Sequence, residues 1–407
     1  MHVIIVGAGL GGLSLAQCLR KNKISFEVFE RDTSPDSRFQ GWAITLRGAV
    51  IDEIATSFPS DMPDLKAATN HLSPLKLPAQ MCMYLPGIEG RIGYEDSPET
   101  PNHRAERLRL RQWLLTNLNV QWGKRVLRID RQDGGITVHF ADGGSARGDI
   151  LVGADGINSV GMTVRGHLLQ RPNISLLNVL PIATIIGEAT LSGDAFKRQL
   201  ELGHSAYIVK GPDEKFFAFC GLHYALADGN SGRYYWHFTQ PDANVGDPDH
   251  WLRKASQQEK LDHVRKLAEA NLPPKLFEIF ELSDAEGVEA KPHIWRDIEL
   301  APNSVPAGPV LLLGDAAHAM MPFRGEGGHH AFLDALRASE LLLKLRDCEG
   351  GCRNTDHLKL AVERYNHEML TRGLDAVKRS KSIAKAENAT GVRPLPEKKI
   401  DLVTALT

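Results

Sequence analysis

The 407-residue sequence has little of what marks secreted, membrane-spanning or nucleic-acid-binding proteins. Its five cysteines are odd in number and scattered (Cys18, Cys82, Cys220, Cys348 and Cys352), which indicates reduced thiols rather than a disulfide framework or a zinc site. No apolar run reaches the roughly 18 residues of a membrane span, and the chain opens on a strand pattern that leaves no room for a signal peptide. The formal net charge of −2 offers no attraction to nucleic acid or acidic membranes. These absences predict a cytoplasmic protein with no metal site, no nucleic-acid partner and no membrane span.

The composition is otherwise that of an ordinary globular protein, with 42% hydrophobic and 24% charged residues. The length allows two domains, or one large domain with an insertion. No internal repeat or low-complexity segment divides the chain, so its organisation has to come from its motifs.

The strongest motif lies in the first thirty residues. Residues 2–6 are a short, apolar, β-branched run that predicts a buried parallel strand. Gly7, Gly9 and Gly12 follow in G-x-G-x-x-G spacing, then a helical pattern, then a second apolar strand that ends on Glu30. Gly7 permits the turn, Gly9 admits a pyrophosphate, Gly12 lets the helix pack on the strand, and Glu30 can accept hydrogen bonds from a ribose. This unit predicts a dinucleotide site and leaves NAD(P) and FAD both open.

A second candidate stretch covers residues 38–46. Arg38 is a possible cation for a ligand, although a solvated loop residue is an equal alternative. Gly41 permits close approach of the backbone to a ligand, and Ala43 follows it as a further candidate contact.

Residues 104–118 predict a helix, because leucines recur every four residues along one face. Arg107 and Arg111 are four residues apart and therefore share a face. Arg104 and Arg107 would lie near the helix start, where the dipole disfavours cations, and this suggests an anionic partner. A solvated basic face is the alternative.

The middle of the chain alternates apolar and polar residues and is rich in aromatics. The pattern predicts strands over residues 182–189, 206–209, 216–220 and 234–238, in an antiparallel sheet with one buried face. Because few charges lie along these strands, an apolar aromatic substrate is favoured over a small carboxylate. The candidate pocket residues are Tyr207, Phe217, Phe219, His237, Pro322 and Phe323, and packing in the core is the alternative for each aromatic side chain.

Residues 310–345 repeat the opening pattern of strand, turn and helix. The apolar run 310–313 predicts a buried strand that ends at Gly314 and Asp315, and ligands of open α/β sheets bind at this edge. A glycine-rich segment with Gly325, Gly327 and Gly328 then leads into a helix.

Together these stretches resemble the FAD-dependent group A aromatic hydroxylases, the para-hydroxybenzoate hydroxylase type. The matching motifs are Gly7–Gly12 with Glu30, Arg107-x-x-Leu110-x-x-x-Leu114, Gly153-Ala154-Asp155-Gly156, and Gly314–His318 with Pro322 and Gly325-x-Gly327. They occur in the family's order and cover the chain up to residue 345. The sequence around Gly41 and over residues 324–328 is most similar to that of the family's fungal secondary-metabolite branch.

The resemblance implies an α/β (α+β overall) fold, with a Rossmann-like FAD-binding domain, an antiparallel-sheet substrate domain and C-terminal helices. The expected FAD-binding domain comprises residues 1–58, 104–177 and 290–350. The substrate domain would comprise 59–103 and 178–289, and 351–407 would form a C-terminal helical segment.

The resemblance also implies roles for residues. Glu30 would hold the adenosine ribose, Arg107 or Arg111 the pyrophosphate region, and Asp315 the ribityl chain, while Asp155 would lie behind the first glycine loop. The expected cofactor contacts are Gly7, Gly9, Gly12, Glu30, Arg38, Gly41, Ala43, Arg107, Arg111, Asp155, Asp315, Gly325, Gly327 and Gly328.

Two positions depart from the family pattern. The family often has Gln at the position of Glu326 and Asn at that of His329. A carboxylate beside a reduced flavin is unfavourable unless it is paired or turned away. His318 is tempting as a catalytic base, but we expect a structural histidine just after the ribityl aspartate.

The reaction that the resemblance implies is monooxygenation of an apolar, aromatic small molecule, by hydroxylation or epoxidation. NADPH or NADH would reduce FAD, O₂ would add at flavin C4a, and the hydroperoxide would transfer one oxygen atom. No catalytic side chain is then obligatory. The alternatives are a flavin-dependent halogenase, whose Trp-x-Trp-x-Ile-Pro signature is absent, a non-catalytic flavin-binding protein, and an NAD(P)-dependent dehydrogenase. The sequence leaves open the substrate, the choice of NADPH or NADH, Baeyer–Villiger insertion, and the oligomeric state.

Overall fold

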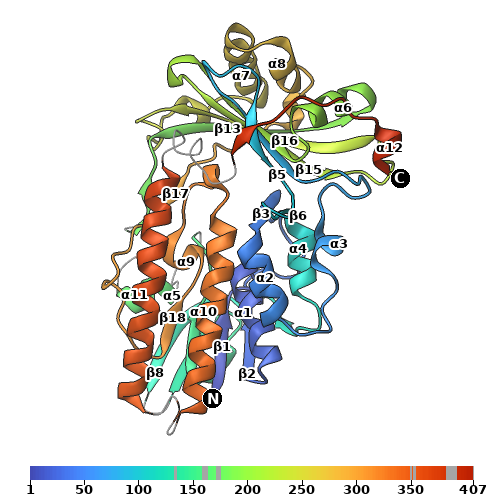
Figure 1. Cartoon of the computed structure of the whole chain (residues 1–407). Coiled ribbons are helices and arrows are strands. Elements are labelled where there is room, and N and C mark those ends of the chain that lie inside the picture. Colours follow the sequence, from blue (N-terminus) through green and yellow to red (C-terminus); the bar gives the residue numbers. More distant parts are fainter. Residues whose placement is uncertain are drawn as a thin grey trace. The chain divides into compact units, whose positions relative to one another are not determined.

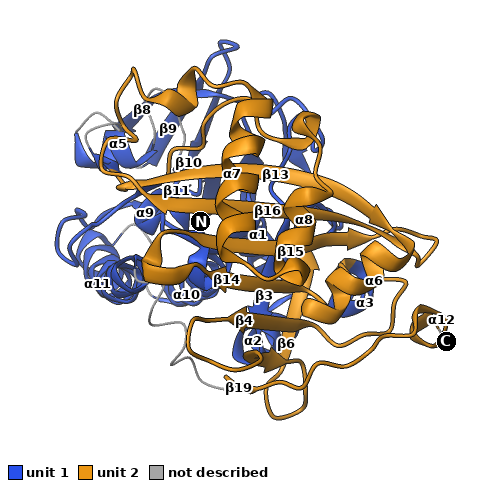
Figure 2. Ribbon diagram, turned by 90° about the horizontal axis from the view of Figure 1, so that it is seen from above, with its two compact units in different colours: residues 1–68, 107–178, 296–386 blue, residues 69–106, 179–295, 387–407 orange. Residues whose placement is uncertain are grey.

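The computed structural model describes residues 1–132, 135–157, 164–170, 176–348, 351, 354–381 and 392–406. The chain folds into two compact units (Figure 2). Unit 1 comprises residues 1–68, 107–178 and 296–386, and unit 2 comprises 69–106, 179–295 and 387–407.

The expected C-terminal segment is not a separate unit. Residues up to 386 belong to unit 1, and residues from 387 onward belong to unit 2. The long helix 355–380 packs on its neighbour in unit 1, whereas the last residues complete a sheet in unit 2. Composition alone cannot show this division, because the two pieces bury their apolar residues in different cores.

A five-stranded parallel sheet is the centre of unit 1. Its strand order is β18-β11-β1-β2-β7, and every neighbouring pair is parallel. The strands are β1 (His2–Val6), β2 (Ser25–Phe29), β7 (Val120–Gln121), β11 (Ile150–Gly153) and β18 (Val310–Leu312). The apolar runs that predicted buried strands at the start of the chain, at 150–152 and at 310–313 are therefore confirmed, and α/β is the observed fold class.

Helices surround this sheet, and the two longest, α10 and α11, run side by side in orange and red (Figure 1). The helices are α1 (Leu10–Lys21), α2 (Gly48–Ser57), α3 (Leu65–Thr69), α4 (Arg107–Leu114), α5 (Val164–Leu169), α9 (Asp315–His318), α10 (Gly327–Asp347) and α11 (Thr355–Ser380). Smaller strands are β3 (Ala43–Arg47), β8 (Val126–Gln132), β9 (Gly135–Phe140), β10 (Ser145–Gly148), β12 (Asn178–Val179) and β17 (Arg296–Asp297). Strands β8, β9 and β10 form an antiparallel meander.

Unit 2 is built on a seven-stranded, mostly antiparallel sheet with the order β13-β16-β15-β14-β4-β5-β19. Only β14 and β4 pair in parallel. The strands of the unit are β4 (Gln80–Tyr84), β5 (Ile92–Glu95), β6 (Asn102–Glu106), β13 (Ile182–Ser192), β14 (Ala206–Lys210), β15 (Phe217–Ala225), β16 (Ser231–Pro241) and β19 (Arg393–Pro394). Its helices are α6 (Gly193–Leu202), α7 (Gln257–Asn271), α8 (Pro274–Glu281) and α12 (Leu402–Leu406).

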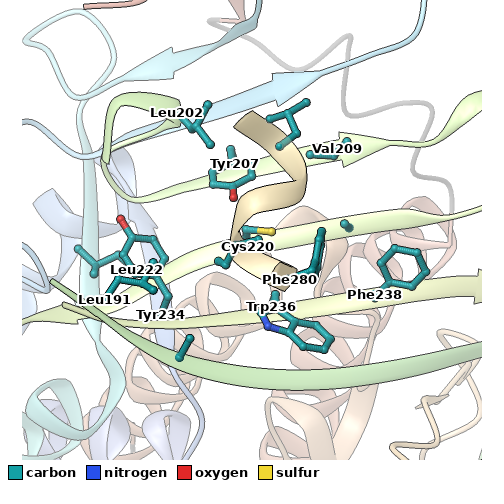
Figure 3. Packing of buried hydrophobic residues seen from close by; sticks show 14 of the residues in the cluster. Leu191, Leu202, Tyr207, Val209, Cys220, Leu222, Tyr234, Trp236, Phe238 and Phe280 are labelled. Carbon is teal, nitrogen blue, oxygen red and sulfur yellow. The ribbon is translucent and has the colours of Figure 1, made fainter. Parts of the chain in front are cut away.

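One face of this sheet forms the hydrophobic core of unit 2 (Figure 3). Tyr234, Trp236 and Phe238 alternate along β16 and point into this core, where Phe280 of α8 packs edge-on against Trp236 at 5.4 Å and Phe238 at 5.8 Å between ring centroids. Side chains alternate between the faces of a strand, so Tyr235 and His237 lie on the opposite face.

The end of the described chain is anchored to unit 2. Strand β19 pairs with β5, and Leu395, Ile400 and Ala405 are buried in the core. The buried guanidinium of Arg91 donates hydrogen bonds to the carbonyl oxygens of Leu395 at 3.3 Å and Pro396 at 2.8 Å, and also to those of Glu201 and Leu202. The prolines near residue 394 suggest a loose tail in the sequence, but these contacts fix the segment.

Among the described residues, Cys18, Cys82, Cys220 and Cys348 are free thiols, and the first three are buried. Burial raises the pKa of the Cys18 and Cys220 thiols to about 12, so both are inert at neutral pH. Cys352 lies outside the described residues.

Replacing Arg91 with alanine should lower the free energy of unfolding by about 2 to 4 kcal/mol, because it leaves buried carbonyl groups without a charged donor. Urea unfolding followed by tryptophan fluorescence measures this loss. The control is Lys399→Ala, which removes an ion pair to Glu201 from a side chain that is 88% exposed. It should change stability by less than about 1 kcal/mol. Equal losses in the two variants would contradict the anchoring role of Arg91.

Candidate functional site

The glycine turn after β1 leaves open space where a ligand group can approach. A Cβ at Gly7, whose φ is +113°, would lie 2.2 Å from the carbonyl oxygen of Ala154, and one at Gly12 would lie 2.0 Å from that of Gly7. At Gly9, by contrast, nothing lies within 4 Å of the Cβ position. Helix α1 begins directly after Gly9 with no side-chain cap and no acidic residue in its first turn. Its first amide groups and the space beside Gly9 therefore fit a pyrophosphate.

Glu30 is held at the edge of this turn, where β2 ends. Its two carboxylate oxygens accept hydrogen bonds from the backbone amides of Ala8 at 2.7 Å and Asp32 at 3.0 Å. The side chain is buried. Each oxygen retains acceptor capacity, so the carboxylate is fixed and can still bind a ribose hydroxyl.

The structure separates the roles of the two arginines on α4. Arg111 is buried and donates to the carbonyl oxygens of Ala8 at 3.0 Å and Pro35 at 2.6 Å. Its guanidinium lies over the ring of Trp122 at 5.3 Å from the centroid. Arg111 therefore supports the glycine turn from behind, because its donors point to the protein itself.

Arg107 and Gly41 lie close together. The amide of Arg107 donates to the carbonyl oxygen of Trp42 at 2.8 Å, and a Cβ at Gly41 would lie 3.2 Å from the Arg107 Nη1 atom. Burial lowers the pKa of Arg107, and the charge of Asp315 opposes this shift. The charges of Arg107 and Asp315, from distant parts of the sequence, therefore interact within unit 1.

Arg38 and Ala43 make fewer contacts that indicate a role at the site. Arg38 is about half exposed and pairs with Asp32 at 2.8 Å, and Ala43 opens β3. The structure places both on the segment that contains Gly41, which is consistent with a ligand-facing loop.

Asp315 stands at the carboxyl end of β18. Gly314 adopts a φ of +60°, and Asp315 then begins α9 with an exposed side chain. Arg165 of α5 supports this turn by donating to the carbonyl oxygen of Ala316 at 2.7 Å. The exposed carboxylate at the sheet edge is therefore available to a ligand.

Asp155 lies behind the glycine turn, after β11. Its Oδ2 atom accepts a hydrogen bond from the amide of Val164 at 3.0 Å, which positions the start of α5. Its Oδ1 atom is buried and has no hydrogen-bond partner among the described residues. Burial raises the pKa of this carboxyl group.

His318 is bound in a buried ion pair. Its Nε2 atom donates to Asp334 Oδ2 at 2.6 Å, and the two side chains are 2% and 0% exposed. Burial alone would lower the pKa of His318, but Asp334 raises it above the ordinary 6.5. This geometry fits the structural histidine predicted from the sequence better than a catalytic base.

The glycine-rich segment leads into α10. Gly325 has a φ of +63°, and α10 begins at Gly327 without a side-chain cap. A Cβ at Gly328 would lie 2.8 Å from Ile44 Cγ2, so the helix start lies close against β3.

Glu326, the carboxylate that departs from the family pattern, is paired. Its Oε1 atom lies 3.2 Å from Arg324 Nε, and its Oε2 atom lies 3.6 Å from Arg379 of α11. Burial lowers the pKa of the neighbouring His329, which favours its neutral form. The two unusual residues therefore add little net charge at the start of α10.

The expected pocket residues divide between the two units. Pro322 is exposed and Phe323 is half-buried in the short 3₁₀ turn of unit 1. Phe217, Phe219 and His237 lie on the face of the unit 2 sheet opposite the core, as their register requires.

Tyr207 was predicted as a pocket wall, and the structure corrects this. Its ring is fully buried in the core cluster, and its hydroxyl donates to Gln199 Oε1 at 2.6 Å. Alternation along β14 places it on the core face, whereas the other three unit 2 candidates lie on the opposite face.

The opposite face contains a buried polar group in which Tyr235 and His223, both candidate polar residues of the pocket, meet Arg104 and Glu106, which the sequence did not place there. Arg104 donates from Nη2 to the hydroxyl oxygen of Tyr235 at 2.6 Å, and its guanidinium lies 5.7 Å from the centre of the Phe219 ring. Glu106 Oε1 lies 3.1 Å from His223 Nε2, and all four polar side chains are buried. The sequence placed Arg104 at a helix start, but α4 begins only at Arg107 and Arg104 lies in β6. Strand β6 reads Asn-His-Arg-Ala-Glu, so no hydrophobic alternation marks it as a buried strand.

The comparisons with known proteins agree with this geometry. Residues 89–380 match the family described as FAD binding domain, and residues 5–70 match the NAD(P)-binding Rossmann-like domain. Because the first match covers most of the chain, the protein belongs to the FAD-binding-domain family of FAD-dependent monooxygenases.

Particular relatives are similar over nearly their whole length. The FAD-dependent monooxygenase thnD of Trichoderma harzianum is 52% identical, over 97% of this chain and 96% of the relative. The FAD-dependent monooxygenase phnB of Penicillium herquei is 28% identical, over 92% and 88% of the two chains.

Solved structures share the fold. Klebsiella pneumoniae HpxO, crystallised with FAD and uric acid, superposes with a TM-score of 0.69 at 22% identity, covering 96% of this chain and 89% of that one. The 2,6-dihydroxypyridine-3-hydroxylase of Arthrobacter nicotinovorans gives a TM-score of 0.68 at 16% identity, covering 95% and 92%.

Across the described residues, no helix combines the length and the hydrophobicity that a transmembrane segment needs.

The His318–Asp334 pair should make stability depend on pH at both ends of the range. The pKa of His318 is raised, so its contribution is complete below 6.5 and is lost as the pH rises through the higher folded value. Asp334, whose pKa is lowered from 3.8 to about 2, contributes above 3.8 and loses this contribution as the pH falls towards 2.

We expect His318→Gln to cost about 2 to 4 kcal/mol near neutral pH. The difference from wild type should shrink towards alkaline pH, as measured by denaturant unfolding at a series of pH values. The matched control is His357→Gln, at an exposed position in the first turn of α11. Its free energy of unfolding should follow that of the wild type at every pH. A difference that stays constant with pH would exclude a charged His318.

Proposed function

We propose that this FAD-dependent monooxygenase uses NADPH or NADH as reductant and hydroxylates or epoxidises an apolar aromatic small molecule. The observation that carries the proposal is the set of groups along one edge of the parallel sheet in unit 1. A glycine turn with open space, the fixed carboxylate of Glu30, the guanidinium of Arg107 and the exposed carboxylate of Asp315 each match one part of FAD.

Each group would contact the part of FAD that its chemistry suits. The first amides of α1 and the guanidinium of Arg107 would bind the pyrophosphate. Glu30 would accept hydrogen bonds from the adenosine ribose, and Asp315 from hydroxyls of the ribityl chain. Arg111 is a positioning residue in this scheme, because its donors hold Ala8 and Pro35.

When bound, FAD would supply the redox chemistry, namely acceptance of a hydride from the nicotinamide and transfer of one oxygen atom of O₂ to the substrate with release of the other as water. The chain itself contributes electrostatics. The uncapped amino end of α10, with Gly327 and Gly328, would stabilise negative charge on the reduced ring. Arg324 and Arg379 compensate Glu326, so its carboxylate does not oppose this effect.

The substrate would lie against the face of the unit 2 sheet that contains Phe219, Tyr235 and His237. Burial lowers the pKa of His237 to about 3, so this imidazole is neutral and suits an apolar ligand. A guanidinium has only donors, so the Tyr235 oxygen accepts from Arg104. The hydroxyl of Tyr235 would hydrogen-bond to an oxygen substituent on the aromatic substrate.

The first test follows the flavin. Purified protein supplied with FAD should show flavin absorbance, and anaerobic NADPH or NADH should bleach it faster when a naphthol is present. With isotopically labelled O₂, one labelled atom should enter the aromatic product and the other should enter water. A protein that binds FAD but, with every aromatic tested, oxidises NADPH while reducing O₂ only to hydrogen peroxide would contradict the proposed oxygen transfer.

Tyr235→Phe should reduce kcat/KM for a hydroxylated aromatic by roughly tenfold, because a hydrogen bond to a charged or polarised partner is lost. The corresponding O-methyl ether should lose less, and FAD affinity should stay unchanged. The matched control is the adjacent Tyr234→Phe, on the core face, whose hydroxyl has no hydrogen-bond partner among the described residues. Equal effects of the two substitutions would place the substrate elsewhere.

A further inference from the structure

The geometry points to Asp334 as a positioning residue for FAD. Its side chain fixes the Asp315 turn relative to the amino end of α10. This inference rests on the proposed assignment of Asp315 to the ribityl chain. It concerns a residue that lies behind the cofactor site and would not touch the cofactor.

Asp334 receives hydrogen bonds from three separate elements. Its Oδ2 atom accepts from the backbone amide of Gly314 at 2.8 Å and from His318 Nε2 at 2.6 Å. Its Oδ1 atom accepts from Arg372 Nη2 of α11 at 2.9 Å. The side chain is fully buried, so these donors replace all of its hydration.

The Gly314 bond matters because the backbone of the turn, which Arg165 also supports at Ala316, determines where the Asp315 carboxylate points. In the described part of the chain no side chain hydrogen-bonds to the Asp315 carboxylate, so the backbone of the turn sets its direction. Gly314 has the positive φ of +60° at which this turn begins. The bond from its amide to Asp334 therefore fixes the conformation that presents Asp315.

Asp334 also fixes α10, to which it belongs. Ala331 lies one turn earlier on the same helix and packs against both glycine motifs. A Cβ at Gly314 would lie 3.3 Å from the Ala331 Cβ, and one at Gly11 of α1 would lie 3.5 Å from it. Helix α10 thus touches the first turn of the pyrophosphate helix and the Asp315 turn together, and Asp334 supplies the polar bond at this contact.

The charges of the cluster keep Asp334 in the form that can accept these bonds. Burial alone would raise its pKa, but His318 and Arg372 lower it to about 2. Arg372 also donates to His330 Nδ1 at 2.9 Å and pairs with Glu368 at 2.8 Å. The carboxylate is therefore ionised across the pH range in which the enzyme would work.

The test is a double-mutant cycle on FAD affinity, measured by quenching of flavin fluorescence when FAD is added to the apoprotein. Asp334→Ala should weaken FAD binding by about tenfold or more, through a lost charge-assisted hydrogen bond. Asp315→Ala should weaken it similarly. If Asp334 acts through the Asp315 turn, the double variant should bind no more than about twofold more weakly than Asp315→Ala alone.

Two further variants complete the design. Glu340→Gln, an exposed position on α10 that pairs with Arg337, is the matched control and should retain wild-type affinity. Asp334→Asn keeps an oxygen that can accept from Gly314, so it should bind FAD more tightly than Asp334→Ala and serves if the alanine variant does not fold. The visible circular dichroism of bound flavin should change in Asp334→Ala and return towards wild type in Asp334→Asn.

The outcomes separate the two levels of inference. A wild-type protein that does not bind FAD would overturn the proposed cofactor contacts. A wild-type protein that binds FAD, with additive losses in the double variant or no loss in Asp334→Ala, would leave those contacts standing and overturn the role of Asp334.

Discussion

The glycine turn of unit 1 depends on one steric constraint, its close contact with the end of β11. Any side chain at Gly7 would collide with the carbonyl oxygen of Ala154, and any side chain at Gly12 would collide with Gly7 itself. This contact brings β1, α1 and β11 together, with Glu30 bonded to the amide of Ala8 and the amide of Asp155 3.0 Å from a Cβ at Gly7.

The charged groups around the turn fall into two sets with different consequences. Arg111 donates to backbone carbonyl oxygens, and the charge of Glu326 is offset by Arg324 and Arg379. Asp315 and the amino ends of α1 and α10 have no such side-chain partner in the described chain. Binding capacity in unit 1 therefore comes from the groups that the fold leaves unsatisfied, and stability comes from the others.

Much of this could be read from the sequence, and the exceptions have identifiable causes. Short apolar runs and glycine spacing predicted the parallel sheet and its turns, because both reflect local backbone requirements. Helical spacing placed Arg107 and Arg111 on one face, but it could not show which of the two donates hydrogen bonds to backbone carbonyl oxygens. Strand alternation gave two faces to the aromatic sheet but could not tell which one the helices cover, so Tyr207 was misplaced. The position of Arg104 in a buried strand could not be predicted, because that strand has no alternation of apolar and polar residues.

The anchoring of the last described segment has a consequence for the order in which the chain can fold during synthesis. One edge of strand β5 cannot pair until β19 has been synthesised, and Arg91 hydrogen-bonds to Leu395, 304 residues further along the chain. Until those residues leave the ribosome, one edge of the unit 2 sheet stays open, and the burial sites of Leu395 and Ile400 stay unfilled. An unpaired sheet edge is prone to pairing with other chains. A nascent or prematurely terminated chain would therefore expose this edge to chaperones and to aggregation, whereas unit 1 already has all its parallel strands once residue 312 has been made.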